Sequence, residues 1–193
     1  MASKFNIDTP RTLHSILFIL DSLQDGVCDM HKIFKILYFA DQKHLTLYGV
    51  PITGDSYIAM KNGPVPSNSY YIFKFLRGDK RLNPAPSTSN YAAWFKVEDS
   101  HWVTAQKKPD LDELSESHLE CLSESIETNK GLSFIQLVAK SHQMAWENAR
   151  SEEMDEMDVI DIAKEGGAND EMIQYIHLNL ENQNLLNQYA AIR

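Results

Sequence analysis

The block of residues 33–70 constrains the fold more tightly than any other part of the sequence. Apolar residues recur at helical spacing from Ile33 to Ala40, and Asp29 stands where a side chain would cap the first turn. Gly49 follows at the far end, where glycine adopts the left-handed conformation of a helix stop without steric cost. The block therefore begins with a helix that Asp29 caps and Gly49 ends.

Polar residues interrupt the apolar pattern of this helix at Lys35, Asp41, Lys43 and His44. Asp41 and His44 are three positions apart, so they lie on one face and are placed to form a hydrogen-bonded pair. The alternative is a surface or half-buried pair of little energetic value, of which helical proteins contain many. The sequence leaves both interpretations open.

Turn and strand signals follow the helix. Proline and glycine within Val50–Asp55 indicate a turn, and residues 56–61 are typical of a short strand. In Gly63–Pro66, two prolines remove backbone donors and keep the residues before them extended, so we expect no regular structure there. Ser67 is then the expected cap of a helix over residues 68–77.

Helical spacing also dominates the flanking segments. Thr9, with proline after it, is the expected cap of the first helix, Ser133 of a later one and Asn169 of the last. The expected helices outside the central block cover residues 9–23, 111–126, 132–139, 159–163 and the stretch after 169.

A β-hairpin is expected between these helices. Residues 91–97 and 101–105 bracket a short polar turn, and the strand near 57–61 is the expected third strand, because a lone hairpin is marginally stable in water. The predicted fold class is therefore mainly α with a small antiparallel β-sheet. This α+β arrangement is expected to form one compact domain over residues 1–193.

Composition argues against several classes of function. The 193 residues carry a net charge of −9, whereas nucleic-acid binding needs clustered Lys and Arg to displace phosphate counterions. Cys28 and Cys121 are single and far apart, which fits a reducing compartment rather than a disulfide scaffold or a zinc site. The N-terminus shows no leader pattern and no apolar run is long enough to span a membrane, so we expect a cytoplasmic protein without membrane contact.

The sequence patterns of common enzymes are missing. There is no P-loop, no dinucleotide-binding glycine motif, no nucleophile elbow and no zinc-protease helix. The closest acid–histidine pairs, Asp41 with His44 and Glu147 with His142, lack a third member that would orient a base beside a nucleophile. We therefore expect a protein that is not an enzyme, with no catalytic residues, cofactor or metal. An unrecognised small hydrolase or other enzyme is the alternative.

Four motifs follow one another along the chain in a distinctive order. They are Lys35–Asp41 with His44, then Tyr48–Asp55, Gly63–Pro66 and, far downstream, Ser141–Trp146. Together they resemble the Panacea (SocA-like) antitoxin domain of bacteria and their phages. The resemblance covers a core of residues 30–150 and leaves 151–193 as an acidic connector and a C-terminal helix.

The resemblance implies an antitoxin that neutralises a co-encoded toxin by direct protein–protein contact. One branch of the family delivers its toxin to a bacterial protease, so a proteolytic adaptor is the alternative. The implied partner is a cognate protein toxin, with a protease as a second partner of an adaptor and a homo-oligomer left open.

Partner contacts are expected on the motifs themselves, because tyrosine anchors carry a large share of binding energy. The candidate partner-binding residues are Tyr38, Asp41, His44, Tyr48, Gly63 and Pro64. The alternative is that these residues are a folding signature, especially the glycine and proline, whose requirement is backbone geometry.

Overall fold

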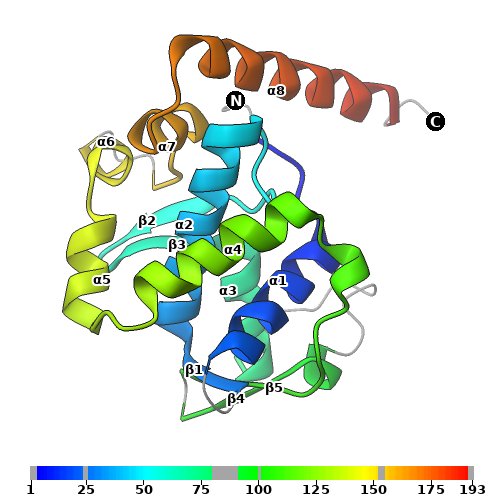
Figure 1. Ribbon diagram of the computed structural model, residues 1–193, viewed down its shortest axis with the longest axis vertical. Coiled ribbons are helices and arrows are strands. Elements are labelled where there is room, and N and C mark those ends of the chain that lie inside the picture. Colours follow the sequence, from blue (N-terminus) through cyan, green and yellow to red (C-terminus); the bar gives the residue numbers. More distant parts are fainter. Residues whose placement is uncertain (1–3, 24–25, 80–90, 100, 152–154, 191–193) are drawn as a thin grey trace.

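The computed structural model describes residues 4–23, 26–79, 91–99, 101–151 and 155–190, so part of the acidic connector, residues 152–154, lies outside the described residues (Figure 1). Helices dominate, with two small antiparallel sheets beside them. The predicted α+β class is confirmed. None of the helices in these ranges is both long and apolar enough to cross a membrane.

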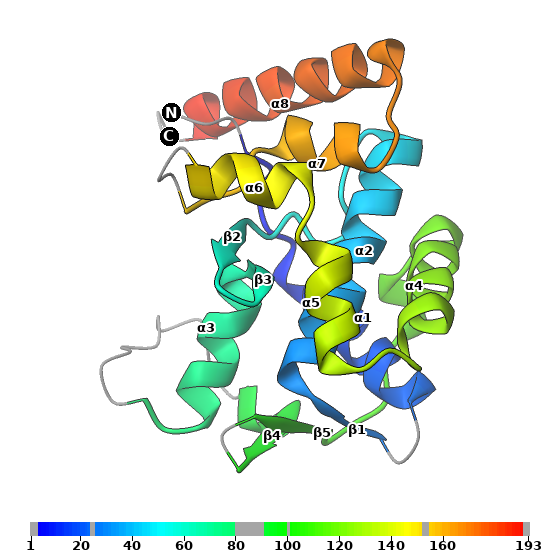
Figure 2. The same ribbon diagram turned by 90° about the vertical axis from the view of Figure 1, so that its left-hand side faces the viewer.

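The long helix α2 (Met30–Tyr48) runs through the middle of the molecule (Figures 1 and 2). The Asp29 carboxylate caps it, and Gly49 ends it with a left-handed φ of 72°, as the sequence predicts. Its apolar side chains contribute to two buried clusters. The helices around it are α1 (Thr9–Ser22), α4 (Glu116–Asn129), α5 (Phe134–Ser141), α7 (Val159–Glu165) and α8 (Asp170–Ala190).

The predicted hairpin forms, but its third strand is a different one. Strands β4 (Phe95–Glu98) and β5 (Trp102–Ala105) pair antiparallel, and β5 also pairs with β1 (Val27–Asp29). The strand expected to join them, β2 (Tyr57–Met60), instead pairs with β3 (Gly63–Pro66) in a separate sheet. The prediction that β2 is the third strand of this sheet was therefore wrong. The third strand is β1, because the segment just before α2 lies against the hairpin.

Strand β3 contradicts the expectation that nothing regular passes through the two prolines. Pro64 lies opposite Ala59 and Pro66 opposite Tyr57, while the Ser67 N–H donates to the Ser56 carbonyl. Hydrogen-bonded positions alternate along an antiparallel strand, so both prolines fall at positions whose N–H would point away from the partner strand. A two-stranded sheet therefore accepts them without losing a cross-strand bond.

Two helix starts differ from the sequence expectation. The first helix is capped by Asp8, whose carboxylate accepts a hydrogen bond from the Arg11 N–H, so Thr9 is already helical. The helix expected over residues 111–126 is divided into a short 3-10 turn, η3 (Leu111–Glu113), and α4, which begins at a capping box formed by Ser115 and His118.

Two other predicted caps are confirmed. The Ser133 hydroxyl caps α5 in a capping box with Gln136. The Asn169 side chain accepts a hydrogen bond from the Met172 N–H at the start of α8. The remaining elements are α3 (Ser67–Leu76), the 3-10 turn η2 (Tyr91–Ala93) and α6 (Met144–Ser151).

The chain after α6 returns to the small sheet before it forms the last two helices. The Ala59 N–H donates to the Asp155 carbonyl, and the Met157 N–H donates to the Tyr57 carbonyl. Met157 is itself buried, together with Ile176 and Leu180 of α8. The described residues after 154 therefore pack on the part of the fold that carries the motifs.

Candidate functional site

Four polar side chains of α2 are almost fully buried: Lys35, Tyr38, Asp41 and His44. They recur at every third position, so each is turned about 60° round the helix from the one before it. Each therefore meets a different segment of the chain. Because a buried polar group is costly unless it is hydrogen-bonded, the partners of these four side chains decide how the segments pack on α2.

Asp41 accepts hydrogen bonds from the segment that follows α2. The Thr53 N–H donates to one carboxylate oxygen at 2.9 Å, and the Thr53 hydroxyl donates to the other. The Tyr57 hydroxyl also donates to that second oxygen, at 2.8 Å. Burial raises the pKa of Asp41 to about 6, although these hydrogen bonds act in the opposite direction. One side chain thus fixes both the turn and β2.

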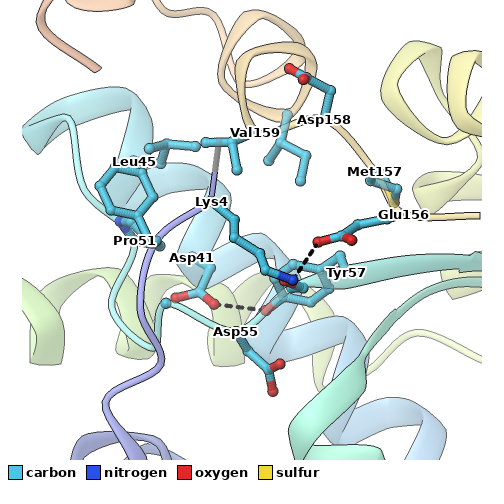
Figure 3. Close-up of a pocket in the computed structure, with 14 residues that line it drawn as sticks. Lys4, Asp41, Leu45, Pro51, Asp55, Tyr57, Glu156, Met157, Asp158 and Val159 are labelled. Carbon is cyan, nitrogen blue, oxygen red and sulfur yellow. Dashed lines mark hydrogen bonds and ion pairs between the residues drawn. The ribbon is translucent and has the colours of Figure 1, made fainter. Parts of the chain in front are cut away.

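Asp41 and Tyr57 lie at the bottom of a pocket between the N-terminal segment and the chain before α7 (Figure 3). Lys4 forms an ion pair with Glu156 at 3.5 Å on the same pocket wall. The cavity volume is about 30 Å³, which holds ordered water but is far below the roughly 300 Å³ of a small-molecule site. The pocket is therefore a poor candidate for binding a substrate.

Asp55, two residues beyond Thr53, caps helix α3 from a distance in sequence. Its carboxylate accepts hydrogen bonds from the N–H groups of Asn68 and Ser69, each at 3.0 Å, and from the Ser69 hydroxyl. Ser67 was the predicted cap, but it is the first residue of the helix and its hydroxyl donates to Asp55. The prediction failed because the acceptor comes from another turn of the chain.

His44 joins α2 to the end of its own turn and to α4. Its Nδ1 lies 2.7 Å from the Val50 carbonyl oxygen, which can only accept, so Nδ1 carries the proton. Its Nε2 then accepts from the Ser117 hydroxyl at 3.1 Å. Burial lowers the pKa of His44, which favours this neutral form. Of the two interpretations left open, neither holds: Asp41 and His44 bond to different partners, and both are buried rather than at the surface.

Tyr38 links α2 to α6 and α7 through Glu165. The Tyr38 hydroxyl donates to one Glu165 oxygen at 3.0 Å, and the Gln42 amide donates to the same oxygen. The other Glu165 oxygen accepts from the Ala145 N–H at 2.8 Å. Burial and the Glu165 carboxylate both raise the pKa of Tyr38, so the phenol remains a donor. The sequence gives no sign of the role of Glu165, because no local pattern marks its partners.

Lys35 is buried against β3 and the end of α5. Its ammonium group donates to the Pro64 carbonyl at 2.7 Å, and burial lowers its pKa to about 7. Gly63 lies beside it with a φ of 95°, close to the side chains of Lys35 and Ser141. Gly63 therefore leaves room for the buried Lys35 side chain, and the Pro64 carbonyl accepts its hydrogen bond.

His142 and Trp146 close this region. Their rings stack at a centroid distance of 3.7 Å, and the Trp146 indole N–H donates to the Met60 carbonyl at 2.9 Å. His142 Nε2 is buried without a hydrogen-bond partner among the described residues. The downstream motif thus anchors the hairpin of β2 and β3 to α6.

The depressed lysine pKa predicts a specific pH dependence of stability. Because the folded state releases the Lys35 proton near pH 7 and the unfolded state near 10.5, wild type should gain stability over Lys35→Met as pH rises between these values. We expect the difference in unfolding free energy to shift by about 2 kcal/mol between pH 7 and 9. Urea unfolding at each pH measures it. Replacement of the exposed Lys61 by Met should show no such trend. A difference in unfolding free energy between wild type and Lys35→Met that is the same at every pH would contradict the lowered pKa of Lys35.

Comparison with known proteins agrees with this arrangement of motifs. A family model described as antitoxin SocA-like, Panacea domain, matches residues 33–147. The chain belongs to this family. No curated protein and no solved structure gives a significant match. The Panacea match contains all four buried polar residues of α2 and ends just after Trp146, so α7 and α8 lie beyond it.

The Panacea structure places the six candidate partner-binding residues unequally. The buried members are Tyr38, Asp41, His44, Gly63 and Pro64. Tyr48 differs, because its side chain is 41% exposed at the C-terminal end of α2. The contacts of the buried five support the folding-signature interpretation, while Tyr48 remains available to a partner.

A groove along the C-terminal half of α2 offers a larger surface than the buried pocket, although Tyr48 does not line it. It has a cavity volume of about 430 Å³ and runs between α2, α4 and the α5–α6 region. Phe39 and the exposed Leu47 supply apolar surface on α2, and Lys140 lies over the Phe39 ring at 4.5 Å. This groove lies mainly within the Panacea match.

Proposed function

We propose that this Panacea protein is an antitoxin that binds a co-encoded protein toxin directly in the bacterial cytoplasm. The observation that carries the proposal is its membership of the SocA-like antitoxin family over residues 33–147. Among the described residues, no group of three His, Cys, Asp or Glu side chains could hold a metal ion.

The proposed toxin contact is the C-terminal end of α2 with the groove beside it. Leu47 is exposed on the groove wall, and the exposed Tyr48 lies at the same end of α2, outside the lining of the groove. Tyrosines are frequent anchors of protein interfaces. Glu124 and Lys43 form an ion pair on the groove wall, which would orient a partner more than it would strengthen binding.

Co-expression with the neighbouring reading frame tests this function. We expect the chain to restore growth and to co-purify with the neighbouring protein in a stoichiometric complex. Rescue that requires an active protease would indicate an adaptor instead. If the neighbouring protein does not inhibit growth and forms no complex with this chain, the proposed function is contradicted.

Surface variants test the contact. We expect Leu47→Ala with Tyr48→Ala to weaken the complex at least about tenfold, because buried aromatic anchors dominate interfaces. Trp102→Ala is the matched control, since Trp102 is also exposed but lies on β5 at the other end of the molecule (Figure 1). Equal affinities of the two variants, measured by calorimetry, would place the toxin contact elsewhere.

A further inference from the structure

Helix α8 is the outermost element of the described chain, lying across the end of α2 and over α7 (Figures 1 and 2). Its inner side is fixed to the body along its length. Ile176 and Leu180 are buried, and the Asn179 amide donates to the Gly49 carbonyl at 3.1 Å. Further along, Gln183 accepts a hydrogen bond from the Asn6 N–H.

In the second half of α8, the distribution of polar and apolar side chains is the opposite of that on an ordinary surface helix. Its polar Gln183 and Asn187 face inward and bond to Asn6, whereas its large apolar residues face solvent. Leu186 and Tyr189 are 69% and 71% exposed, and Leu185 is half exposed. A helix that turns its amides to the body and its leucines to water has an apolar face without a partner.

The exposed residues form one continuous stripe. Positions 175, 178, 182, 185 and 189 are separated alternately by three and four residues, which is the spacing of a coiled-coil seam. The stripe, called here the α8 seam, consists of Tyr175, Leu178, Asn182, Leu185, Leu186 and Tyr189.

Four members of the α8 seam are arranged symmetrically about Asn182, whereas Leu185 has no counterpart, because the mirror position is Asn179, which bonds to Gly49. Leu178 and Leu186 lie four residues to either side of it, and Tyr175 and Tyr189 lie seven residues to either side. A twofold-symmetric contact between identical helices running in opposite directions requires this self-complementary order. An asparagine at the centre of an apolar seam can pair with its own copy and fix the register.

The exposed apolar area agrees with a second copy as the occupant. Covering the exposed parts of the five apolar side chains would remove about 600 Å² from each chain, or about 1,200 Å² in total, the lower limit for a stable interface. From residue 165 to 190 the chain contains no Lys or Arg, and Glu181 is the only acid beside the centre of the seam. Apolar contact rather than ion pairing would therefore hold the pair together.

We propose that the α8 seam pairs antiparallel with the same seam of a second copy, making this protein a twofold-symmetric dimer. The interface lies beyond the residues of the family match. We expect this dimer, with an interface at the lower limit of area, to be weak and to dissociate in the micromolar range. Dimerisation is independent of any toxin, so it stands or falls separately from the proposed function.

Sedimentation equilibrium of the purified full chain tests the dimer. Wild type should change from monomer to dimer between about 1 and 100 µM, and Leu178→Gln with Leu185→Gln should weaken association at least about fiftyfold. Glutamine keeps the helix propensity of leucine, so α8 itself should persist. The control is Phe134→Gln with Ile135→Gln, an apolar pair on α5 that is at least as exposed, which should leave association unchanged. A wild-type monomer at all concentrations, or an unchanged double variant, overturns the proposal.

Cysteine cross-linking tests the direction of pairing. Asn182→Cys should form a disulfide across the twofold axis, whereas Tyr189→Cys should not, because the two copies of residue 189 would lie about 21 Å apart along the helix axes. The native Cys28 and Cys121 are buried, so wild type measures the background level of cross-linking. A disulfide between two copies of Tyr189→Cys would contradict the antiparallel arrangement.

Discussion

Replacing Asp41 by alanine should destabilise the fold by about 3 kcal/mol, because three buried donors on Thr53 and Tyr57 lose their shared acceptor. For a domain of this size, that corresponds to a decrease of roughly 6–12 °C in melting temperature. Thermal and urea unfolding followed by circular dichroism would measure it. The exposed Asp112→Ala is the control and should change stability by less than about 0.5 kcal/mol.

Comparing wild type with Asp41→Ala at several pH values should also reveal how the stability that Asp41 contributes depends on pH. Its folded pKa of about 6 lies above the ordinary aspartate value of 3.8, so Asp41 contributes most stability below pH 3.8 and loses it as pH rises through 6. The penalty of Asp41→Ala should therefore be about 1 kcal/mol larger at pH 5 than at pH 7.5. A penalty that grows toward pH 7.5 would mean that the carboxylate form is the more stable one in the fold.

Replacing Gly63 by alanine should also cost about 3 kcal/mol. Its φ of 95° is unfavourable for any residue with a side chain, and an added methyl group would approach Lys35 Nζ to 2.7 Å and collide with the Ser141 hydroxyl. The strand β3 would have to move away from α2, and the bond from Lys35 to Pro64 would lengthen. Urea unfolding gives the free energy, and a retained Lys35 pKa near 7 would argue against this movement.

Gly131 supplies the matched control for Gly63→Ala. No positive φ applies to it, and an added Cβ would meet no atom within 4 Å. Gly131→Ala should therefore be neutral or slightly stabilising, because alanine restricts the unfolded chain. Equal effects of the two substitutions would show that the packing around Gly63 adjusts freely.

Local signals in the sequence were sufficient for the elements that depend on neighbouring residues. The start and end of α2 follow from Asp29 and Gly49, and the caps at Ser133 and Asn169 act within their own helices. The hairpin of β4 and β5 follows from two short strands around a polar turn. In each case, the deciding contact spans only a few residues.

Predictions failed where the deciding partner was distant in the chain. Asp55 replaces Ser67 as the cap of α3, and β1 replaces β2 beside the hairpin. Asp41 was recognised as a notable residue, but its partners are Thr53 and Tyr57 rather than His44. A helical spacing of three shows that two side chains are near each other, yet it does not reveal which other segment brings better donors.

The sequence by itself determined the helical character, the α+β class and the motifs that identify the family, because periodicity, caps and turn residues act locally. Only the tertiary structure decided that Tyr38, Asp41 and His44 are buried while Tyr48 is exposed. Only the tertiary structure also turned the amides of α8 inward and its leucines outward. The physical reason is that burial depends on which surfaces meet, and the segment that lies against the second half of α8 offers it the polar Asn6, which is far away in the chain.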